Sequence, residues 1–387
     1  MRKIYFETLF LLVLSLIIFL SCGSHIPVSI LKVCVDDNIT EEGIGKWEKI
    51  QDFGEPRIYH TAIWTGSEMI IWGGTIEGEG VNTGGRYNPV EDMWLPLRMD
   101  DAPTGRGRHT AVWTGKEMII WGGSPHGDYG AYAGETLNDG GKYDPTTDSW
   151  KKINISNGPS PRASHSAVWT GQYMIIFGGR NGSDVLNDGY KYSPGEDKWY
   201  QIDLENAPSP RESHIAIWDG ARMFVWGGVG KDGISLNDGA KYIPDLNKWI
   251  NISSLNAPSP RLGFSGVWTG KEMIIWGGYS GNELLNTGGR YNPETDLWSH
   301  TTISGAPSPR YLHTAVWTGE SMIIFGGGCV TGGIYNPVAD SWTPTSTINP
   351  PGPRAGHTAV WTGKEMLIYG GVMLEENKDD VGWKYIP

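Results

Sequence analysis

Short apolar runs separated by turn residues recur along almost the whole chain. A representative stretch, residues 162–210, contains four such runs, at 166–169, 174–177, 189–192 and 198–202. Each run is rich in β-branched or aromatic residues and is bounded by glycine, proline or polar residues, a pattern that is typical of strands. The intervening segments are short enough for hairpin turns. The pattern therefore predicts a four-stranded antiparallel meander, whose strands we name a, b, c and d.

The same phrase occurs seven times, with a period of about 49 residues, which identifies a repeat architecture. Each copy starts at an arginine that precedes strand a. These arginines are Arg57, Arg106, Arg162, Arg211, Arg261, Arg310 and Arg354. Although 387 residues would otherwise suggest two or three domains, stacked repeats share one continuous core. The repeat predicts one ring-shaped domain.

Each copy also carries a glycine pair after strand b, and six copies carry a tyrosine in strand c and a tryptophan in strand d. In the first copy these residues are Gly73-Gly74, Tyr87 and Trp94. This combination resembles the kelch repeat, and its spacing fits the kelch length of about 50 residues. The resemblance implies an all-β fold, a seven-bladed kelch β-propeller with four antiparallel strands per blade.

The last copy ends at Pro387 before a strand d can form. The missing phrase stands at the other end of the chain, where residues 46–50 (KWEKI) match the strand d phrase at 149–153 (SWKKI). We therefore expect the N-terminal strand to complete the last blade and close the ring, so that the propeller spans 46–387. Closure would protect the sheet edges.

Residues 1–22 have the layout of a secretory signal. Arg2 and Lys3 precede the apolar run 9–20, and Ser21-Cys22 follows. Twelve helical residues rise about 18 Å, less than the roughly 30 Å hydrocarbon core, so a spanning helix is disfavoured. The end of the segment resembles a bacterial lipobox, although Phe19 stands where leucine is usual.

The lipobox resemblance implies lipidation at Cys22, export across the inner membrane and a lipoprotein anchored in the bacterial cell envelope, with 23–45 as a linker. Ordinary cleavage near Cys22 and an uncleaved anchor are the alternatives. We expect a monomer that contacts the membrane only through this anchor. Strand direction places Cys34 and Cys329 on opposite faces of the disc, so we expect them not to pair.

The formal net charge of −12 argues against nucleic acid, because duplex binding depends on clustered lysine and arginine. Length differences between the copies fall in the b-to-c loops, whereas the a-to-b turns hardly vary. Loops tolerate insertion and carry function, so the face formed by the b-to-c and d-to-a loops is the predicted binding surface for a protein or a carbohydrate.

The longest b-to-c loop, residues 124–136 in copy two, and the loop of copy seven supply the candidate ligand-binding residues. These are His126, Asp128, Tyr129, Tyr132, Glu375 and Glu376. Aromatic side chains beside carboxylates suit a sugar or an exposed peptide segment. The alternative is that the long loop only fills space at the surface.

The seven starting arginines form a second candidate, a ring at the channel mouth that could bind anions. The alternative is structural, because Asp139, Asp188 and Asp238 lie where they can pair with these arginines. Histidine stands three residues after the arginine in six copies, and Phe264 replaces it in copy five. We expect structural hydrogen bonding from these histidines and no metal ring.

Two enzyme families use kelch propellers, galactose oxidase and N-acetylneuraminate epimerase. No cluster of histidine and tyrosine here matches the copper ligands of the first family, and no acid or base can be assigned by similarity to the second. The sequence therefore predicts a binding protein without a cofactor. The alternative is a carbohydrate-active enzyme, such as a sialic acid epimerase or mutarotase.

Overall fold

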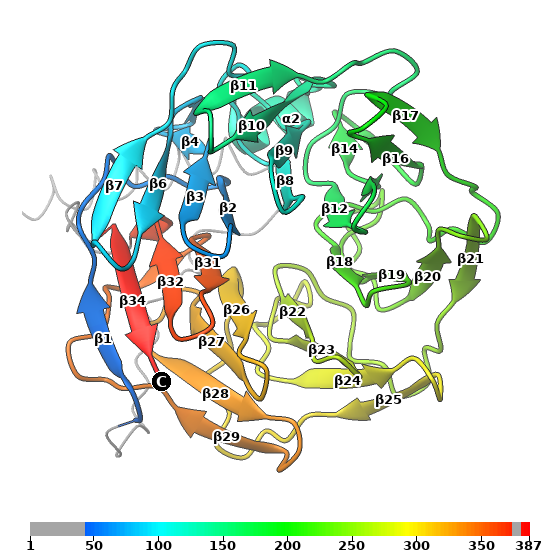
Figure 1. Cartoon of the computed structure of the whole chain (residues 1–387). Coiled ribbons are helices and arrows are strands. Elements are labelled where there is room, and N and C mark those ends of the chain that lie inside the picture. The colour runs from blue at the N-terminus through cyan, green and yellow to red at the C-terminus, as the bar shows by residue number, and fades with distance from the viewer. Residues whose placement is uncertain (1–42, 374–380) are drawn as a thin grey trace, which may run out of the picture.

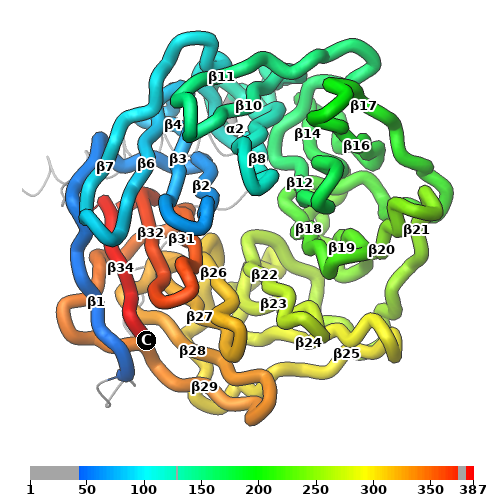
Figure 2. Tube along the Cα trace, in the orientation of Figure 1, coloured from blue at the N-terminus to red at the C-terminus, as the bar shows by residue number. Residues whose placement is uncertain are grey.

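The computed structural model describes residues 43–373 and 381–387 (Figure 1). Seven four-stranded antiparallel sheets are arranged around a central channel, and the chain passes through them in sequence order (Figures 1 and 2). Strand a of each sheet lies at the channel and strand d lies at the rim. The predicted seven-bladed propeller is confirmed.

The blades contain the following strands, given in the order a, b, c, d. Blade one has β2 (Thr61–Trp64), β3 (Met69–Trp72), β6 (Gly84–Asn88) and β7 (Met93–Pro96); blade two has β8 (Thr110–Trp113), β9 (Met118–Trp121), β10 (Gly140–Asp144) and β11 (Ser149–Lys152). Blade three has β12 (Ser166–Trp169), β13 (Met174–Phe177), β16 (Gly189–Ser193) and β17 (Lys198–Gln201); blade four has β18 (Ile215–Trp218), β19 (Met223–Trp226), β20 (Gly239–Ile243) and β21 (Lys248–Asn251). Blade five has β22 (Ser265–Trp268), β23 (Met273–Trp276), β24 (Gly288–Asn292) and β25 (Leu297–His300); blade six has β26 (His313–Trp317), β27 (Met322–Gly326), β28 (Gly332–Asn336) and β29 (Ser341–Pro344). Blade seven has β31 (Thr358–Trp361), β32 (Met366–Tyr369), β34 (Gly382–Ile386) and, from the other end of the chain, β1 (Lys46–Lys49).

The core lies between the blades rather than at one centre. Seven hydrophobic clusters each combine residues of two neighbouring sheets, and every residue of strand b is buried. Strand b lies between strands a and c and has a neighbouring blade on each face, so an unbroken apolar run such as Met174–Phe177 is needed there. Strand d is mostly exposed or partly exposed apart from its tryptophan, which packs inward.

The glycine pair permits a close approach between neighbouring blades. Gly178 adopts a φ of +65°, and a Cβ added there would lie 2.6 Å from the carbonyl oxygen of Arg211. A side chain is therefore excluded both by the left-handed backbone and by the next blade.

The ring is closed as predicted. β1 pairs antiparallel with β34, with Trp47 opposite Tyr385. The Trp47 indole donates a hydrogen bond to the carbonyl oxygen of Ser346, 3.1 Å away in the preceding blade. The carbonyl of Ile44 accepts from the Tyr385 hydroxyl, a position that Asp92 occupies opposite Tyr87 in blade one. The first described residues thus stand where other blades have a c-to-d turn.

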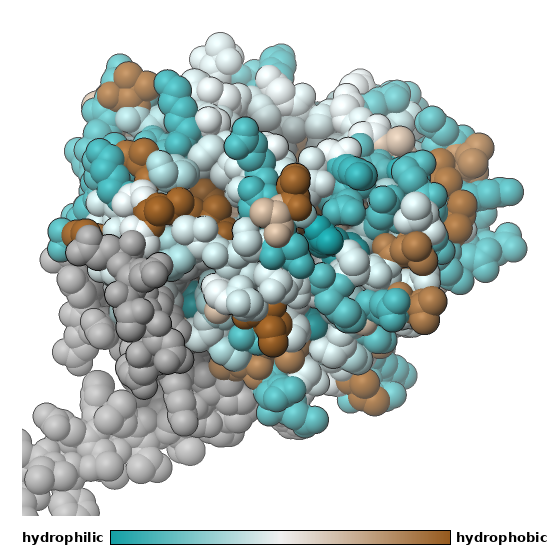
Figure 3. Space-filling model, turned by 90° about the horizontal axis from the view of Figure 1, so that it is seen from below, coloured by the Kyte–Doolittle hydropathy of each residue, from teal (hydrophilic) through white to brown (hydrophobic). Residues whose placement is uncertain are grey.

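Seen from the edge, the disc carries hydrophobic residues in small patches between hydrophilic ones (Figure 3). Single exposed apolar residues are ordinary on protein surfaces. Within 43–373 and 381–387, no helix has the length and apolar character needed to cross a membrane.

Candidate functional site

The b-to-c loops build most of one face of the disc, and three of them contain short two-stranded ladders or a helix. Blade one has β4 (Thr75–Ile76) with β5 (Glu79–Gly80), and blade three has β14 (Arg180–Asn181) with β15 (Asp184–Val185). Between them, blade two has the helix α2 (Gly127–Ala133). In blade seven, β33 (Val372–Met373) pairs with β30 (Arg354–Ala355) of the d-to-a connection. This face is where the insertions of the sequence accumulate.

The long loop of blade two is held by its neighbours on both sides. The backbone N–H of Gly80 donates to the carbonyl of Pro125 at 2.6 Å, and the N–H of Gly182 donates to the carbonyl of Ala131 at 2.8 Å. The Thr136 hydroxyl adds a hydrogen bond to Asn181 at 2.8 Å. The loop is thus an ordered bridge from blade one to blade three, which the sequence pattern did not predict.

His126 lies at the blade-one end of this bridge. Its Nδ1 is 3.0 Å from a carboxylate oxygen of Glu79, and its Nε2 is 3.5 Å from one of Glu135. All three side chains are substantially exposed, so solvent screens the interactions and they contribute little stability. His126 remains accessible to a ligand.

Tyr132 lies at the other end, over a buried ion pair. Arg180 Nε donates to Glu212 at 2.7 Å, and both side chains are less than a tenth exposed. The Tyr132 ring covers the guanidinium at 4.3 Å, and its hydroxyl donates to the same carboxylate at 3.2 Å. Because an uncompensated buried charge is costly, this three-blade contact fixes the position of α2.

The other candidate ligand-binding residues are placed less completely. Asp128 and Tyr129 belong to α2, and their side chains lie outside the described part of the structure. Glu375 and Glu376 fall in 374–380, outside the described residues. The structure therefore brings His126 and Tyr132 onto one surface.

The channel mouth on this face contains residues that sequence reasoning missed. The guanidinium of Arg108 stacks on the ring of Tyr59 at 3.9 Å and donates to Ser164 at 3.2 Å. These residues occupy the same variable position of the Arg-x-x-His phrase in successive copies, and all three have positive φ. A comparison of the variable positions within that phrase would have found them.

The seven starting arginines do not form an exposed ring. All are buried, and their guanidinium groups donate to the first glycine carbonyl of the following pair. Arg106, Arg162 and Arg211 also form ion pairs with Asp139, Asp188 and Asp238, at 2.8, 2.7 and 3.0 Å. These donors are engaged in joining each blade's own loops, so the anion-binding interpretation is replaced by the structural one.

The six histidines also have a structural role. Each is buried, and its Nε2 is hydrogen bonded to a hydroxyl on strand a of the preceding blade, as His165 is to Thr110 at 2.8 Å. Phe264 takes the seventh place, and Ile215 stands where the other blades have threonine or serine. Within the described chain, no three histidine, cysteine, aspartate or glutamate residues are grouped as a metal site.

Burial lowers the pKa of His60, His109, His214 and His313 to about 3, and nearby arginines act in the same direction. The pKa values of His165 and His357 are lowered well below the ordinary range for the same reasons. These six imidazoles are therefore neutral at physiological pH.

Cys329 is not a free thiol. It lies fully buried in the b-to-c loop of blade six and is disulfide-bonded. Its partner lies outside the described residues, where Cys22 and Cys34 are the only other cysteines of the sequence. The expectation that Cys34 and Cys329 do not pair stays a prediction, because Cys34 lies outside the described residues, and it can hold only if Cys22 is the partner.

These features define a kelch-type β-propeller, a fold that serves in general as a protein-binding scaffold. The model of the KLHDC2/KLHL20/DRC7 Kelch-repeats domain family matches residues 38–207 and again 204–371, so the chain belongs to that family. A comparison with curated proteins found no match.

Proposed function

We propose that this chain is an envelope-anchored binding protein that captures a protein or carbohydrate ligand on the face of its b-to-c and d-to-a loops. The observation that carries the proposal is the ordered bridge at 124–136. It is the largest departure from the repeat, and Tyr132, Arg180 and Glu212 hold it in place across three blades. A rigid, variable surface on a constant scaffold is typical of recognition sites.

Replacing residues 124–136 with the shorter blade-three segment, 180–185, tests this surface. We expect the variant to fold, because the disc's four-stranded sheets are untouched, and to lose ligand capture. A photo-crosslinking residue at His126 in intact cells should give a specific adduct, whereas one at the exposed Leu297 of strand β25 should not.

Glycan-array binding of the two forms identifies the ligand class. Equal capture by the parent and the loop-replaced form would place the ligand site elsewhere. Turnover of free sialic acid, or of a similar sugar, would favour the alternative of a carbohydrate-active enzyme.

The disulfide at Cys329 supports export, since disulfides persist mainly in oxidising compartments outside the cytosol. It also constrains the anchor. If the sulfur of Cys22 is bonded to lipid, it cannot also form a disulfide, so the lipoprotein proposal requires the bridge Cys34–Cys329.

A Cys22→Ala variant is therefore expected to lose fatty-acid labelling and to leave the membrane fraction, because one lipid-modified residue supplies the anchor. Peptide mapping without reduction should find Cys34 joined to Cys329 in both forms. A mapped Cys22–Cys329 bridge, or a wild-type protein that is fully soluble, would contradict lipidation.

A further inference from the structure

A cavity opens at the opposite end of the central channel, where the a-to-b turns lie. Its volume is about 500 Å³, and it is lined by the ends of the inner strands of six blades. Six tryptophans from equivalent positions contribute to the wall, and we name them the tryptophan collar: Trp64, Trp113, Trp169, Trp218, Trp317 and Trp361. Alanine, valine and isoleucine of the same strands complete the lining. The site is separate from the b-to-c face.

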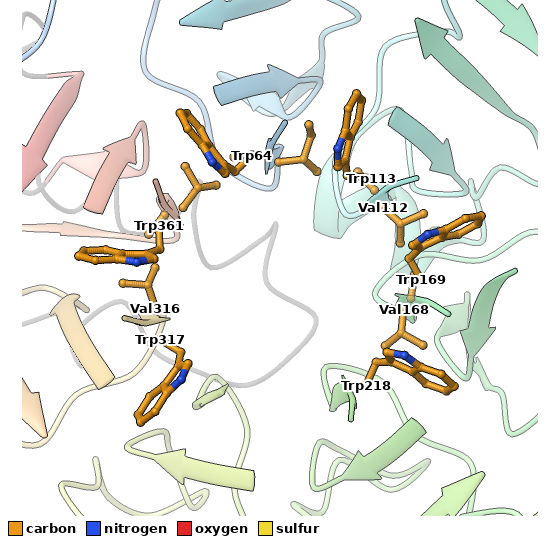
Figure 4. Close-up of a pocket in the computed structure, with 15 residues that line it drawn as sticks. Trp64, Val112, Trp113, Val168, Trp169, Trp218, Val316, Trp317 and Trp361 are labelled. Atoms are coloured by element: carbon orange, nitrogen blue, oxygen red, sulfur yellow. The ribbon is translucent and has the colours of Figure 1, made fainter. Parts of the chain in front are cut away.

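The collar presents ring edges rather than ring faces to the cavity. In Figure 4 the indoles point away from the cavity centre, with their nitrogen atoms at the inner ends of the rings. Trp64, for example, packs against the cluster between blades seven and one, which includes Leu367 and Tyr87. Aromatic edges carry partial positive charge, and the indole N–H is only a donor. The cavity is therefore lined with hydrogen-bond donors on an apolar wall.

These N–H groups differ from those of the other repeated tryptophans. All seven strand d tryptophans donate to a backbone carbonyl of the preceding blade, as Trp94 does to Gln51 at 2.9 Å. Within 43–373 and 381–387, none of the six collar indoles has a protein acceptor. Their N–H groups are available to a ligand in the cavity.

The lining side chains select for an unusual ligand. They donate hydrogen bonds but accept none, because no carboxylate, amide or hydroxyl side chain contributes to the wall. The inner edges of the strands offer both N–H and C=O groups, so the backbone does not favour a donor-rich ligand over an acceptor-rich one. A saccharide would bring many hydroxyl donors that these side chains cannot satisfy. The best match is an apolar ligand that is rich in acceptors and poor in donors.

Proline-rich peptide has this chemistry. Proline has no backbone N–H but keeps its carbonyl, and the polyproline II helix leaves its carbonyls free of internal hydrogen bonds. Aromatic-lined sites bind such segments with a small loss of conformational entropy. We propose that the tryptophan collar binds a proline-rich peptide segment in the polyproline II conformation, which enters the channel from the a-to-b face. The pyrrolidine rings contact the aliphatic wall, and carbonyls accept hydrogen bonds from the indoles.

A fluorescein-labelled decaproline peptide tests the proposal by fluorescence anisotropy, with a glycine–serine decamer as the peptide control. The double variant Trp113→Phe/Trp169→Phe keeps an aromatic ring at each position, although a smaller one, and removes two N–H groups. We expect it to bind decaproline about tenfold more weakly or worse, the combined effect of two modest hydrogen bonds. Trp268→Phe is the matched control, because Trp268 occupies the equivalent position on β22 outside the cavity lining, and it should bind like wild type.

The thermal midpoint of each variant shows that the blades remain packed. If the double variant is destabilised, the two single variants are compared with Trp268→Phe instead. The proposal is overturned if wild type shows no saturable decaproline binding, if it binds the glycine–serine decamer equally well, or if the collar variants bind unchanged. The form lacking residues 124–136 should still bind decaproline, which separates this site from the b-to-c face.

Discussion

Lowering the pH from 7 to 5 is expected to remove on the order of 8 kcal/mol of unfolding free energy through His60, His109, His214 and His313, and more through His165 and His357. All six histidines are neutral in the native ring and become protonated in the unfolded chain. The native pKa of each is lowered, to about 3 for four of them. A histidine in an unfolded chain titrates near 6.5, so the unfolded state binds more protons throughout the interval between.

The unfolding free energy therefore decreases as the pH is lowered. The stability contributed by these groups is present above about pH 6.5 and falls as the pH drops, by about 2 kcal/mol at pH 5 for each of the four histidines whose native pKa is about 3. The total is comparable with the whole stability of an ordinary domain, so acid unfolding should be steep. Denaturant titrations at several pH values measure it.

One interface of the ring lacks the histidine and provides a natural control for the acid sensitivity. Blade five already has a phenylalanine in the histidine position, with isoleucine as its partner in blade four. The double substitution Thr110→Ile/His165→Phe copies that pair and removes one titrating group. It should lose less unfolding free energy than wild type between pH 7 and pH 5. An equal pH dependence in both proteins would show that His165 is not a source of the acid sensitivity.

Deleting residues 46–50 is expected to open the ring. The deletion removes Trp47, which is 6% exposed and packs with its ring centroid 4.4 Å from that of Phe325. Truncation of a buried tryptophan alone costs about 3 to 5 kcal/mol, and the deletion also exposes the edge of β34. The variant should melt at a much lower temperature and self-associate in size-exclusion chromatography.

The point variants Trp47→Ala and Lys49→Ala separate loss of packing from loss of the strand. Trp47→Ala should lower the unfolding free energy by about 3 kcal/mol or more, whereas Lys49→Ala, at an exposed position of the same strand, should have little effect. A deletion variant that stays monomeric and melts like the parent would refute closure by β1.

The ring itself was predictable because each blade repeats the same local sequence pattern. Apolar runs bounded by glycine specify the strands, and in blade three the predicted and observed bounds differ by one residue at the end of strands c and d. The structural role of the arginines could be weighed in advance, because in three copies an aspartate stands in the same LNDG phrase at the start of strand c. A single short apolar run is a weak indication of a strand, but seven equivalent runs at a fixed period make the prediction firm.

The contacts of the binding face could not be predicted in the same way. The segment 127–133 contains two glycines and is too short for a stable isolated helix, so α2 depends on its contacts with neighbouring blades. The contact between Tyr132, Arg180 and Glu212 joins three blades at positions that differ from copy to copy, so no periodicity reveals it. The disulfide of Cys329 could not be predicted either, because strand direction constrains the propeller but not the chain before it.

The histidine–hydroxyl pairs have a consequence for how such a ring diverges. Each pair spans two sequence repeats, so neither repeat can change its half without affecting its neighbour. Where one copy carries Phe264, the copy before it carries Ile215. A duplicated or transplanted blade would carry one half of each of two pairs and would meet mismatched partners on both sides. The residues that must change together therefore lie on the two sides of an interface between blades. They do not coincide with one repeat of the sequence, because each interface takes one half from each of two neighbouring repeats.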